Sequence, residues 1–178
     1  MKKHNLRLLT KLSIIYFLSV ILFACGYSFA PRGESIDQRI QKIYVDSFEN
    51  GTSQAGIENY VRTAFINQLI QSSRFKVASS AESADAIIRG KILNLHTSTV
   101  AHLKNDLAAE ERATMIMKVV FEDSVNGKTI WSQKEMTDSV DYTLNQDINL
   151  LANVRKQALM KLSNDMAEKA FNLMMSGF

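Results

Sequence analysis

The amino-acid sequence predicts an α+β fold, a two-layer sandwich in which a mostly antiparallel sheet of about four strands carries two helices on one face. Two segments have apolar residues at helical spacing, one in the first half of the chain and one at its end. Three long β-type segments lie between them without an intervening helix, so they can pair antiparallel. Because both helices need a common apolar surface, and one sheet face can supply it, we expect a single domain.

Residues 1–24 are typical of a targeting segment and precede this domain. The apolar stretch Leu12–Phe23 has 12 residues, which suits a signal peptide and falls short of the roughly 20 residues that span a bilayer. A buried N-terminal helix is the alternative, but it leaves the basic residues ahead of the stretch unexplained. These are Lys2, Lys3, Arg7 and Lys11.

The charge of the chain changes when this leader is removed. The whole chain has 21 basic and 18 acidic residues, and the leader holds four of the basic ones and no acid. The remaining 154 residues therefore carry 17 basic and 18 acidic side chains, a net charge of −1. A nucleic-acid-binding domain would show a basic excess in its folded part, so the composition does not support that class.

The first part of the domain is predicted as a tether, a strand and a helix. Residues 25–39 contain the only proline, Pro31, and are expected to form the tether, with the domain at 40–178. Ile40–Phe48 is rich in β-branched and aromatic residues and predicts a strand. A helix is predicted over Gln54–Ser72, with Thr52 or Ser53 as its N-cap. Its expected apolar face consists of Ile57, Val61, Ala64, Phe65, Gln68 and Leu69, with only Gln68 interrupting it.

The rest of the chain is predicted as a short edge strand, three long strands and a helix. The edge strand is Arg74–Val77, and a small polar loop follows it at 79–84. Asn126-Gly127 predicts a tight hairpin turn between the last two long strands. The long strands are Ala86–Val100 with a bulge at Gly90 or near Leu93, then, after a loop at His102–Arg112, Ala113–Asp123 and Lys128–Asp141. Asn145 is the expected cap of a final helix to about Met175, with Gly177 as its stop.

The sequence also predicts which residues face the core in one strand and in the last helix. Along the middle long strand, Met115, Met117, Val119 and Phe121 share one face. Along the last helix, the expected apolar stripe comprises Ile148, Leu151, Val154, Ala158, Leu162, Met166, Ala170 and Leu173.

Motifs for catalysis or metal binding are not evident. His96 and His102 have no metal-ligand spacing, and no Gly-rich phosphate loop or nucleophile elbow occurs. The adjacent carboxylates Glu110-Glu111 and Glu122-Asp123 lie in or beside predicted loops, and neighbours along a strand face opposite ways. We therefore expect a protein that is not an enzyme and that needs no cofactor or metal.

The only cysteine, Cys25, follows the apolar stretch in Leu22-Phe23-Ala24-Cys25, which resembles the lipobox of bacterial lipoproteins. The resemblance implies that the Cys25 thiol receives a diacylglycerol, that the chain is cut before it and that the new amine is acylated. Several acyl chains give stable membrane anchoring. Gly26 stands where an aspartate would favour inner-membrane retention, so the resemblance favours the outer membrane.

Over its whole mature length, the chain resembles the LptE family of lipopolysaccharide-assembly lipoproteins. The ordered combination of segments carries the resemblance rather than any one motif. The segments are Cys25-Gly26-Tyr27 with Phe29, Ile43–Val77, Ala84–Ile92, Phe121–Ser132 and the long C-terminal helix. Such proteins sit as a plug and assembly factor inside a large outer-membrane β-barrel, LptD, and assist insertion of lipopolysaccharide into the outer leaflet. The resemblance thus implies an LptD-like barrel and lipopolysaccharide as partners.

Lipopolysaccharide has phosphates, and Arg89, Lys91 and Lys118 are candidate residues for binding them. Arg89 and Lys91 share one strand face, and Lys118 is expected on a neighbouring strand. A solvated face is the plain alternative for these three. For the whole protein, the alternative is a periplasmic lipoprotein that activates a cell-wall synthase. The 14 residues 26–39 reach at most about 50 Å, which favours a partner at the membrane.

Overall fold

The computed structural model describes residues 36–102, 109–144 and 147–177, which belong to one compact unit, Arg32–Phe178. Several predictions concern residues outside the described ranges. They are the leader, the tether up to residue 35, the lipidation of Cys25 and the Asn145 cap. Ile36 and Ile40 are both buried in the core of this unit. None of the helices within the described ranges has the length and apolar character needed to cross a membrane.

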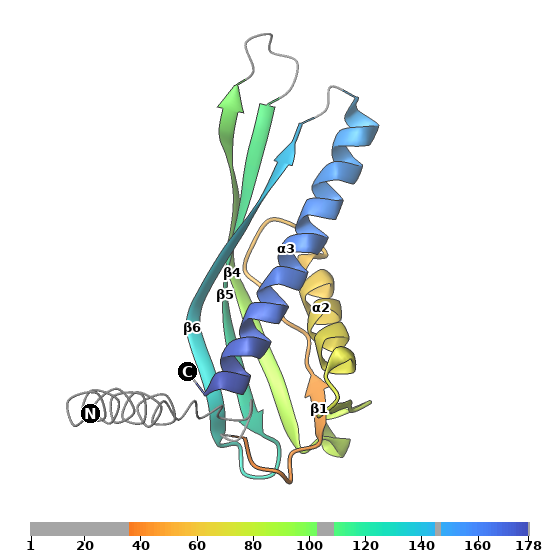
Figure 1. Cartoon of the computed structure of the whole chain (residues 1–178), viewed down its shortest axis with the longest axis vertical. Coiled ribbons are helices and arrows are strands. Elements are labelled where there is room, and N and C mark those ends of the chain that lie inside the picture. Colours follow the sequence, from red (N-terminus) through yellow and green to blue (C-terminus); the bar gives the residue numbers. More distant parts are fainter. Residues whose placement is uncertain (1–35, 103–108, 145–146, 178) are drawn as a thin grey trace, which may run out of the picture. The chain divides into compact units, whose positions relative to one another are not determined.

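Two long helices and a sheet make up the fold, and Figure 1 shows their arrangement. In chain order the elements are β1 (Lys42–Val45), β2 (Glu49–Asn50), α2 (Ile57–Gln71), β3 (Lys76–Val77), a 3₁₀ turn (Ala81–Ser83), β4 (Ala86–His102), β5 (Ala109–Asp123), β6 (Thr129–Thr143) and α3 (Ile148–Ser176).

The α+β class is confirmed, whereas the predicted sheet of about four mostly antiparallel strands is wrong in detail. The sheet is mixed and has six strands in the order β3-β1-β4-β5-β6, with β2 also paired to β4. β4, β5 and β6 are antiparallel, but β1 runs parallel to β3 and β4, and β2 runs parallel to β4. The parallel pairs arise because α2 carries the chain back across the sheet between β1 and β3.

Two predicted boundaries need correction. The strand expected over Ile40–Phe48 is shorter in the structure, where β1 covers only Lys42–Val45. Phe48 is buried beyond its end, and β2 follows at Glu49–Asn50, outside the predicted range. The loop expected over His102–Arg112 is too long, since β4 extends to His102 and β5 begins at Ala109. Backbone pairing continues there although the side chains are polar. The bulge near Leu93 is confirmed by a register shift between Ile92 and Asn94.

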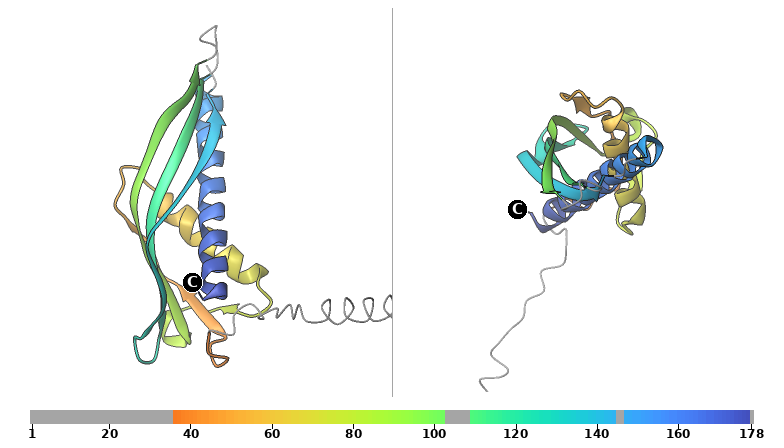
Figure 2. Two further views of the ribbon diagram at one scale, coloured as in Figure 1. Left: turned by 60° about the vertical axis from the view of Figure 1, so that its left-hand side comes forward. Right: turned by 90° about the horizontal axis from the view of Figure 1, so that it is seen from above.

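α2 and α3 cover the same face of the sheet (Figure 2). The predicted inward residues of β5, Met115, Met117, Val119 and Phe121, have no exposed surface. The predicted face of α2 is confirmed at Ile57, Val61, Ala64, Phe65 and Leu69, and that of α3 at Ala158, Leu162, Met166 and Ala170. Gly177 (φ 77°) ends α3, as predicted.

The predicted N-cap of α2 is wrong. The helix begins after Gly56, whose φ of 83° suits glycine, and no side chain caps it. Thr52 instead closes a turn: its N–H and hydroxyl both donate to Asn50 Oδ1, at 2.9 and 2.8 Å. The polar residues that suggested a cap therefore stabilise the loop before the helix.

Gly90 on β4 allows the core to close. The ring of Phe48 stacks on Phe65 of α2 at a centroid distance of 5.1 Å. A Cβ added at Gly90 would lie 2.3 Å from the Phe48 ring and 2.6 Å from the backbone oxygen of Lys118. Because neither neighbour can withdraw easily, this position requires a residue without a side chain.

We expect Gly90→Ala to lower the free energy of unfolding by about 1–3 kcal/mol through overpacking against Phe48. Urea denaturation followed by circular dichroism measures this change. Ser132→Ala, at an exposed position on β6, is the control and should change stability by at most about 0.5 kcal/mol. Equal stability of the two variants would contradict the close approach of Phe48 to the sheet.

Carboxylates tie the N-terminal entry of the domain to the end of the sheet. Arg39 forms an ion pair with Asp123, which is 3% exposed. Asp85 Oδ2 accepts hydrogen bonds from the backbone N–H groups of Gln41 and Lys42, at 2.9 and 2.7 Å. These two bonds hold the pKa of Asp85 below its ordinary value of 3.8, and the bond from Lys42 has the larger effect.

We expect Asp85→Asn to cost about 1–2 kcal/mol of stability at neutral pH, because charged acceptors make the stronger hydrogen bonds. The pKa of Asp85 is lower in the folded state, so its contribution is full above 3.8 and fades as pH falls through the folded value. Unfolding experiments at several pH values should therefore show the two proteins converging in acid. A gap that persists unchanged in acid would refute this role for Asp85.

Candidate functional site

The three basic residues predicted as a binding cluster lie together on the sheet face opposite the helices. Arg89 and Lys91 are two positions apart on β4, and Lys118 of β5 is the direct cross-strand partner of Lys91. Arg89 and Lys91 side chains are about half exposed, at 50% and 48%. The sequence-based placement of these residues on one face therefore agrees with the register.

Two of these three basic residues already form ion pairs with acidic neighbours. Arg89 pairs with Asp46 at 3.0 Å and with Glu122 at 2.6 Å. Lys91 pairs with Glu49 at 3.1 Å. The cluster therefore has as many carboxylates as cations, and an anion would have to displace them.

Lys118 is the cation of this cluster that stays available. It is exposed and makes no ion pair with any other residue that the structure describes. A single exposed ammonium binds a phosphate weakly, because solvent screens its charge. We infer that the outer face is a weaker anion site than its composition suggests.

A second candidate site lies in a groove between the N-terminal parts of α2 and α3. It has a volume of about 390 Å³, within the range of small-ligand sites. Its wall includes Tyr60 of α2 and Leu151 and Leu159 of α3, and its cations are Arg155 and Lys156. Gln54 and Ala152 complete the lining.

The charge of α3 favours anions at this groove. From Ile148 to Asn164 the helix contains three basic residues and no acidic one. Lys161 is engaged by Asp165 at 2.5 Å, whereas Arg155 and Lys156 are exposed and form no ion pair within the described part of the chain. An apolar wall beside two free cations suits a ligand with both a hydrocarbon portion and a negative group.

Next to the groove, Tyr142 of β6 ties the far end of the sheet together. Its hydroxyl donates to Glu111 Oε2 at 2.5 Å. Burial and then the bond to Glu111 raise the pKa of Tyr142 to about 12, although the charge of Arg155 opposes this. Tyr142 is therefore neutral at physiological pH, and it acts as a donor that orients Glu111.

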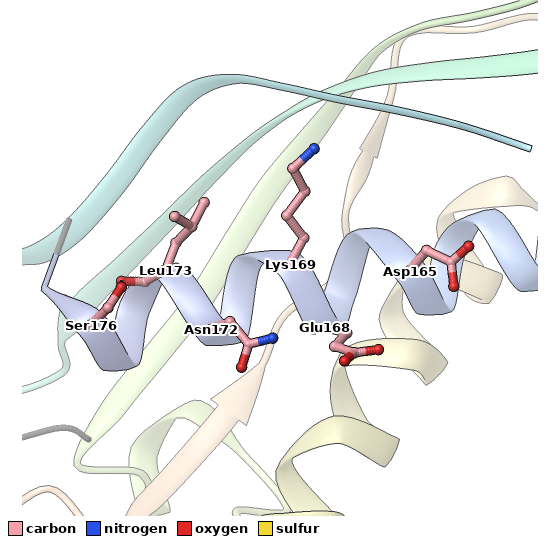
Figure 3. A pocket seen from close by; sticks show the side chains of 6 residues that line it. All are labelled: Asp165, Glu168, Lys169, Asn172, Leu173 and Ser176. Atoms are coloured by element: carbon pink, nitrogen blue, oxygen red, sulfur yellow. The ribbon is translucent and has the colours of Figure 1, made fainter. Parts of the chain in front are cut away.

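Figure 3 shows a third concave region, a shallow depression of about 580 Å³ along the C-terminal half of α3. Lys169 and Leu173 point toward the sheet, whereas Glu168 and Asn172 point away from it (Figure 3). The ammonium of Lys169 donates to the carbonyl oxygen of Thr137 at 2.8 Å. With its one cation engaged and two carboxylates at its border, the depression does not suit an anionic ligand.

The adjacent carboxylates are separated as the strand pattern predicts. Glu122 binds Arg89 on the outer face, while Asp123 is buried and accepts backbone N–H bonds in the β5–β6 turn. His96 is exposed on β4. Within the described ranges no three His, Cys, Asp or Glu side chains converge as a metal site would require.

Comparison with known families gives a match over residues 40–174 to LptE, described as lipopolysaccharide-assembly. The chain belongs to the LptE family. The match covers nearly the whole domain, so the resemblance inferred from the sequence is confirmed. No curated protein matched the chain.

Solved structures share the fold of this LptE-family chain at low identity. PelC from Paraburkholderia phytofirmans, solved as a dodecamer, has a TM-score of 0.52 and 16% identity, covering 79% of this chain and 92% of its own. A protein from Xanthomonas campestris has a TM-score of 0.51 and 11% identity, with coverages of 77% and 85%. A protein from Caulobacter crescentus gives 0.50 and 13%, with 73% and 89%. At these identities the likeness concerns the fold alone.

Sequence reasoning missed the groove of this LptE-family domain. Its residues come from two segments about 90 positions apart, and nothing local connects Tyr60 with Lys156. One signal was present, the long run of α3 without an acidic residue ahead of Asp165. The carboxylate partners of Arg89 and Lys91 were also missed, because β1 and β2 pair with β4 in a parallel arrangement that the sequence did not predict.

Proposed function

We propose that this LptE-family protein is an outer-membrane lipoprotein, anchored on the periplasmic side through acylated Cys25. It docks as a plug in an LptD-like β-barrel and assists insertion of lipopolysaccharide into the outer leaflet. The observation that carries the proposal is the family match over residues 40–174, because membership in a lipopolysaccharide-assembly family assigns the chain to that process.

The construction of the domain supports docking near the membrane. The tether would enter beside Arg39 and Asp123, at the end of the sheet that holds the β5–β6 turn. β5 has 15 residues and extends about 50 Å from that end. A lipid-anchored domain of this length can reach through the depth of a membrane-embedded barrel.

The groove between α2 and α3 supports contact with the lipid itself. Lipopolysaccharide combines acyl chains with phosphates, and the groove combines Tyr60 and Leu151 with the free cations of Arg155 and Lys156. The outer-face residues Arg89, Lys91 and Lys118 are the competing site, and their carboxylate partners weaken it. We therefore assign lipopolysaccharide binding to the groove first.

Purification from detergent-solubilised membranes tests the partner. We expect an epitope-tagged full-length chain to co-purify with an outer-membrane β-barrel that resists unfolding by detergent at low temperature. Recovery with soluble cell-wall synthases and no barrel would refute the proposal and support the alternative of a synthase activator. A lipoprotein of unrelated fold, purified in the same way, controls for barrels trapped in micelles.

Paired substitutions test the lipid site on the purified protein. Arg155→Gln with Lys156→Gln should weaken lipopolysaccharide binding about tenfold or more, because each charge-assisted hydrogen bond is worth about 1.5–3 kcal/mol. Displacement of a fluorescent lipopolysaccharide measures the affinity, and Lys91→Gln with Lys118→Gln is the matched control. Loss of binding only in the control pair would place the site on the outer face instead. Unchanged binding in both would refute lipid contact at either surface.

A further inference from the structure

The C-terminal part of β4 is a formed strand with one side unpaired. β1 pairs with β4 as far as Ile88 and β2 as far as Ile92, where Gly51 N–H donates to the Ile92 oxygen at 2.9 Å. β4 continues to His102 with β5 on its other side. No other described strand pairs with its segment Leu93–His102, and Figure 2 shows this part of β4 at the border of the sheet.

The register shows which backbone groups face this open edge. The carbonyl oxygens of Ile88 and Ile92 point away from β5, because they accept bonds from the N–H groups of Asp46 and Gly51. The extra residue of the bulge after Ile92 shifts this alternation by one position. The outward N–H and C=O groups are therefore those of Leu95, Thr97 and Thr99. Such a row of donors and acceptors is complementary to an extended polypeptide, and neither an acyl chain nor a phosphate satisfies both kinds of group.

The composition of this open edge departs from that of ordinary edge strands. The sequence LNLHTSTVAH contains no Asp, Glu, Lys, Arg or Pro, the residues that normally block strand addition. Every residue of Leu93–Val100 except Leu95 is exposed, and Leu93 and Val100 expose 37% and 45% of their surfaces. An approaching strand would therefore meet small hydroxyl and apolar side chains and no charge.

The opposite edge of the sheet carries the usual protection. Lys169 of α3 reaches β6 and donates to the Thr137 carbonyl oxygen at 2.8 Å. Charged residues also follow one another along this strand, namely Lys134, Glu135, Asp138 and Asp141. The contrast between the two strands identifies β4 as the edge that is suited to receive a further strand.

The tether of this chain is too short to occupy the edge. Arg39 lies level with Ala86 through its ion pair with Asp123, so Leu95 is nine strand residues, about 30 Å, farther along β4. Residues 26–35 span about 35 Å when fully extended. They would be used up in reaching Leu95 and could not also connect the domain to the membrane.

A second copy and the barrel wall are excluded as well. Two copies that paired through this edge would run antiparallel about a two-fold axis, which places their tether ends roughly 70 Å apart along the strands. Docking in a barrel sets the strands across the membrane, so the tether of the second copy would not reach the leaflet. The wall of a closed barrel offers no strand, because each of its strands is already paired on both sides.

We propose that the open edge of β4 binds, by strand addition at Leu95–Thr99, an extended segment of the barrel partner that lies outside its wall. The identity of this partner rests on the proposed function. The edge lies away from the tether end of the sheet, so a docked domain presents it inside the barrel, where a segment folded into the lumen meets it. Because the outward backbone groups supply the bonds, an extended backbone matters more than the sequence of the segment.

Proline and alanine at one position separate backbone recognition from side-chain recognition. A photo-cross-linking amino acid placed at Thr99 of the full-length, membrane-anchored chain should react with the barrel. Thr97→Pro should lower this yield about tenfold, because proline removes the outward N–H and its ring blocks the approaching strand. Thr97→Ala keeps the backbone and should leave the yield unchanged. Undiminished cross-linking in Thr97→Pro, or an equal loss in Thr97→Ala, would overturn the proposal.

A position on the other edge strand controls for the fold. Proline is compatible with an edge position whose N–H faces away from the sheet, so circular dichroism should show that Thr97→Pro is folded. The same photo-cross-linking amino acid at Ser139, an exposed position on β6, should react with the barrel to the same extent with and without Thr97→Pro. A parallel loss at Ser139 would show that the proline affects docking as a whole and would contradict a local role of the edge.

Mass spectrometry of the Thr99 cross-link identifies the occupant without any proline variant. We expect one contiguous peptide of the barrel chain that lies between its wall strands or ahead of them. A wall strand, a lipid or a second copy of this chain as the product would overturn the proposal. Recovery of the barrel without a cross-link at Thr99 would refute the edge and leave the proposed function intact. A cross-link to a protein that forms no barrel would refute the barrel as the partner, and with it the proposed function.

Discussion

The difference in rise between a strand and a helix controls which surfaces of this domain are covered. β4 has 17 residues and extends about 56 Å, whereas the 15 residues of α2 extend about 22 Å. α3, with 29 residues and about 43 Å, follows β6 and β5 over most of their length. β1 and β2 end early as well. The near part of the sheet is therefore covered by two helices, and the far part of β4 is covered by neither.

The same core explains the distribution of charge. Because the inward face of β5 is apolar and buried from Ala113 to Phe121, every charged residue of the strands except Asp123 must lie outside or at an end. Arg89 and Lys91 thus reach the outer face, where the parallel strands bring Asp46 and Glu49 beside them. The cations of α3 have no such neighbours, so Arg155 and Lys156 remain available at the groove.

The sequence predicted features that depend on residues close together along the chain, and it missed features that depend on distant segments. Alternation along β5 and helical spacing along α2 and α3 are local patterns driven by burial, and they predicted the core and the layers. The two-residue strands β2 and β3 have too few positions for a pattern, and their parallel pairing depends on where α2 returns the chain. Ala109–Arg112 was predicted as loop because polarity suggested solvent, although the backbone there is held by cross-strand bonds. The groove depends on the crossing of two helices and had only an indirect charge signal.

The domain thus separates stability from recognition along its length. Near Arg39, the contacts of Asp85, Asp123 and the Phe48–Gly90 pair fix the chain in a well-packed end. Away from it, the open edge of β4 and the groove of α3 expose surface that the core does not use for packing. Since local stability is lowest where buried apolar contacts are fewest, we expect that end to adjust to a ligand more easily than the well-packed end. The proposed function would use this division, with the well-packed end toward the membrane and the less packed end toward lipopolysaccharide and the barrel.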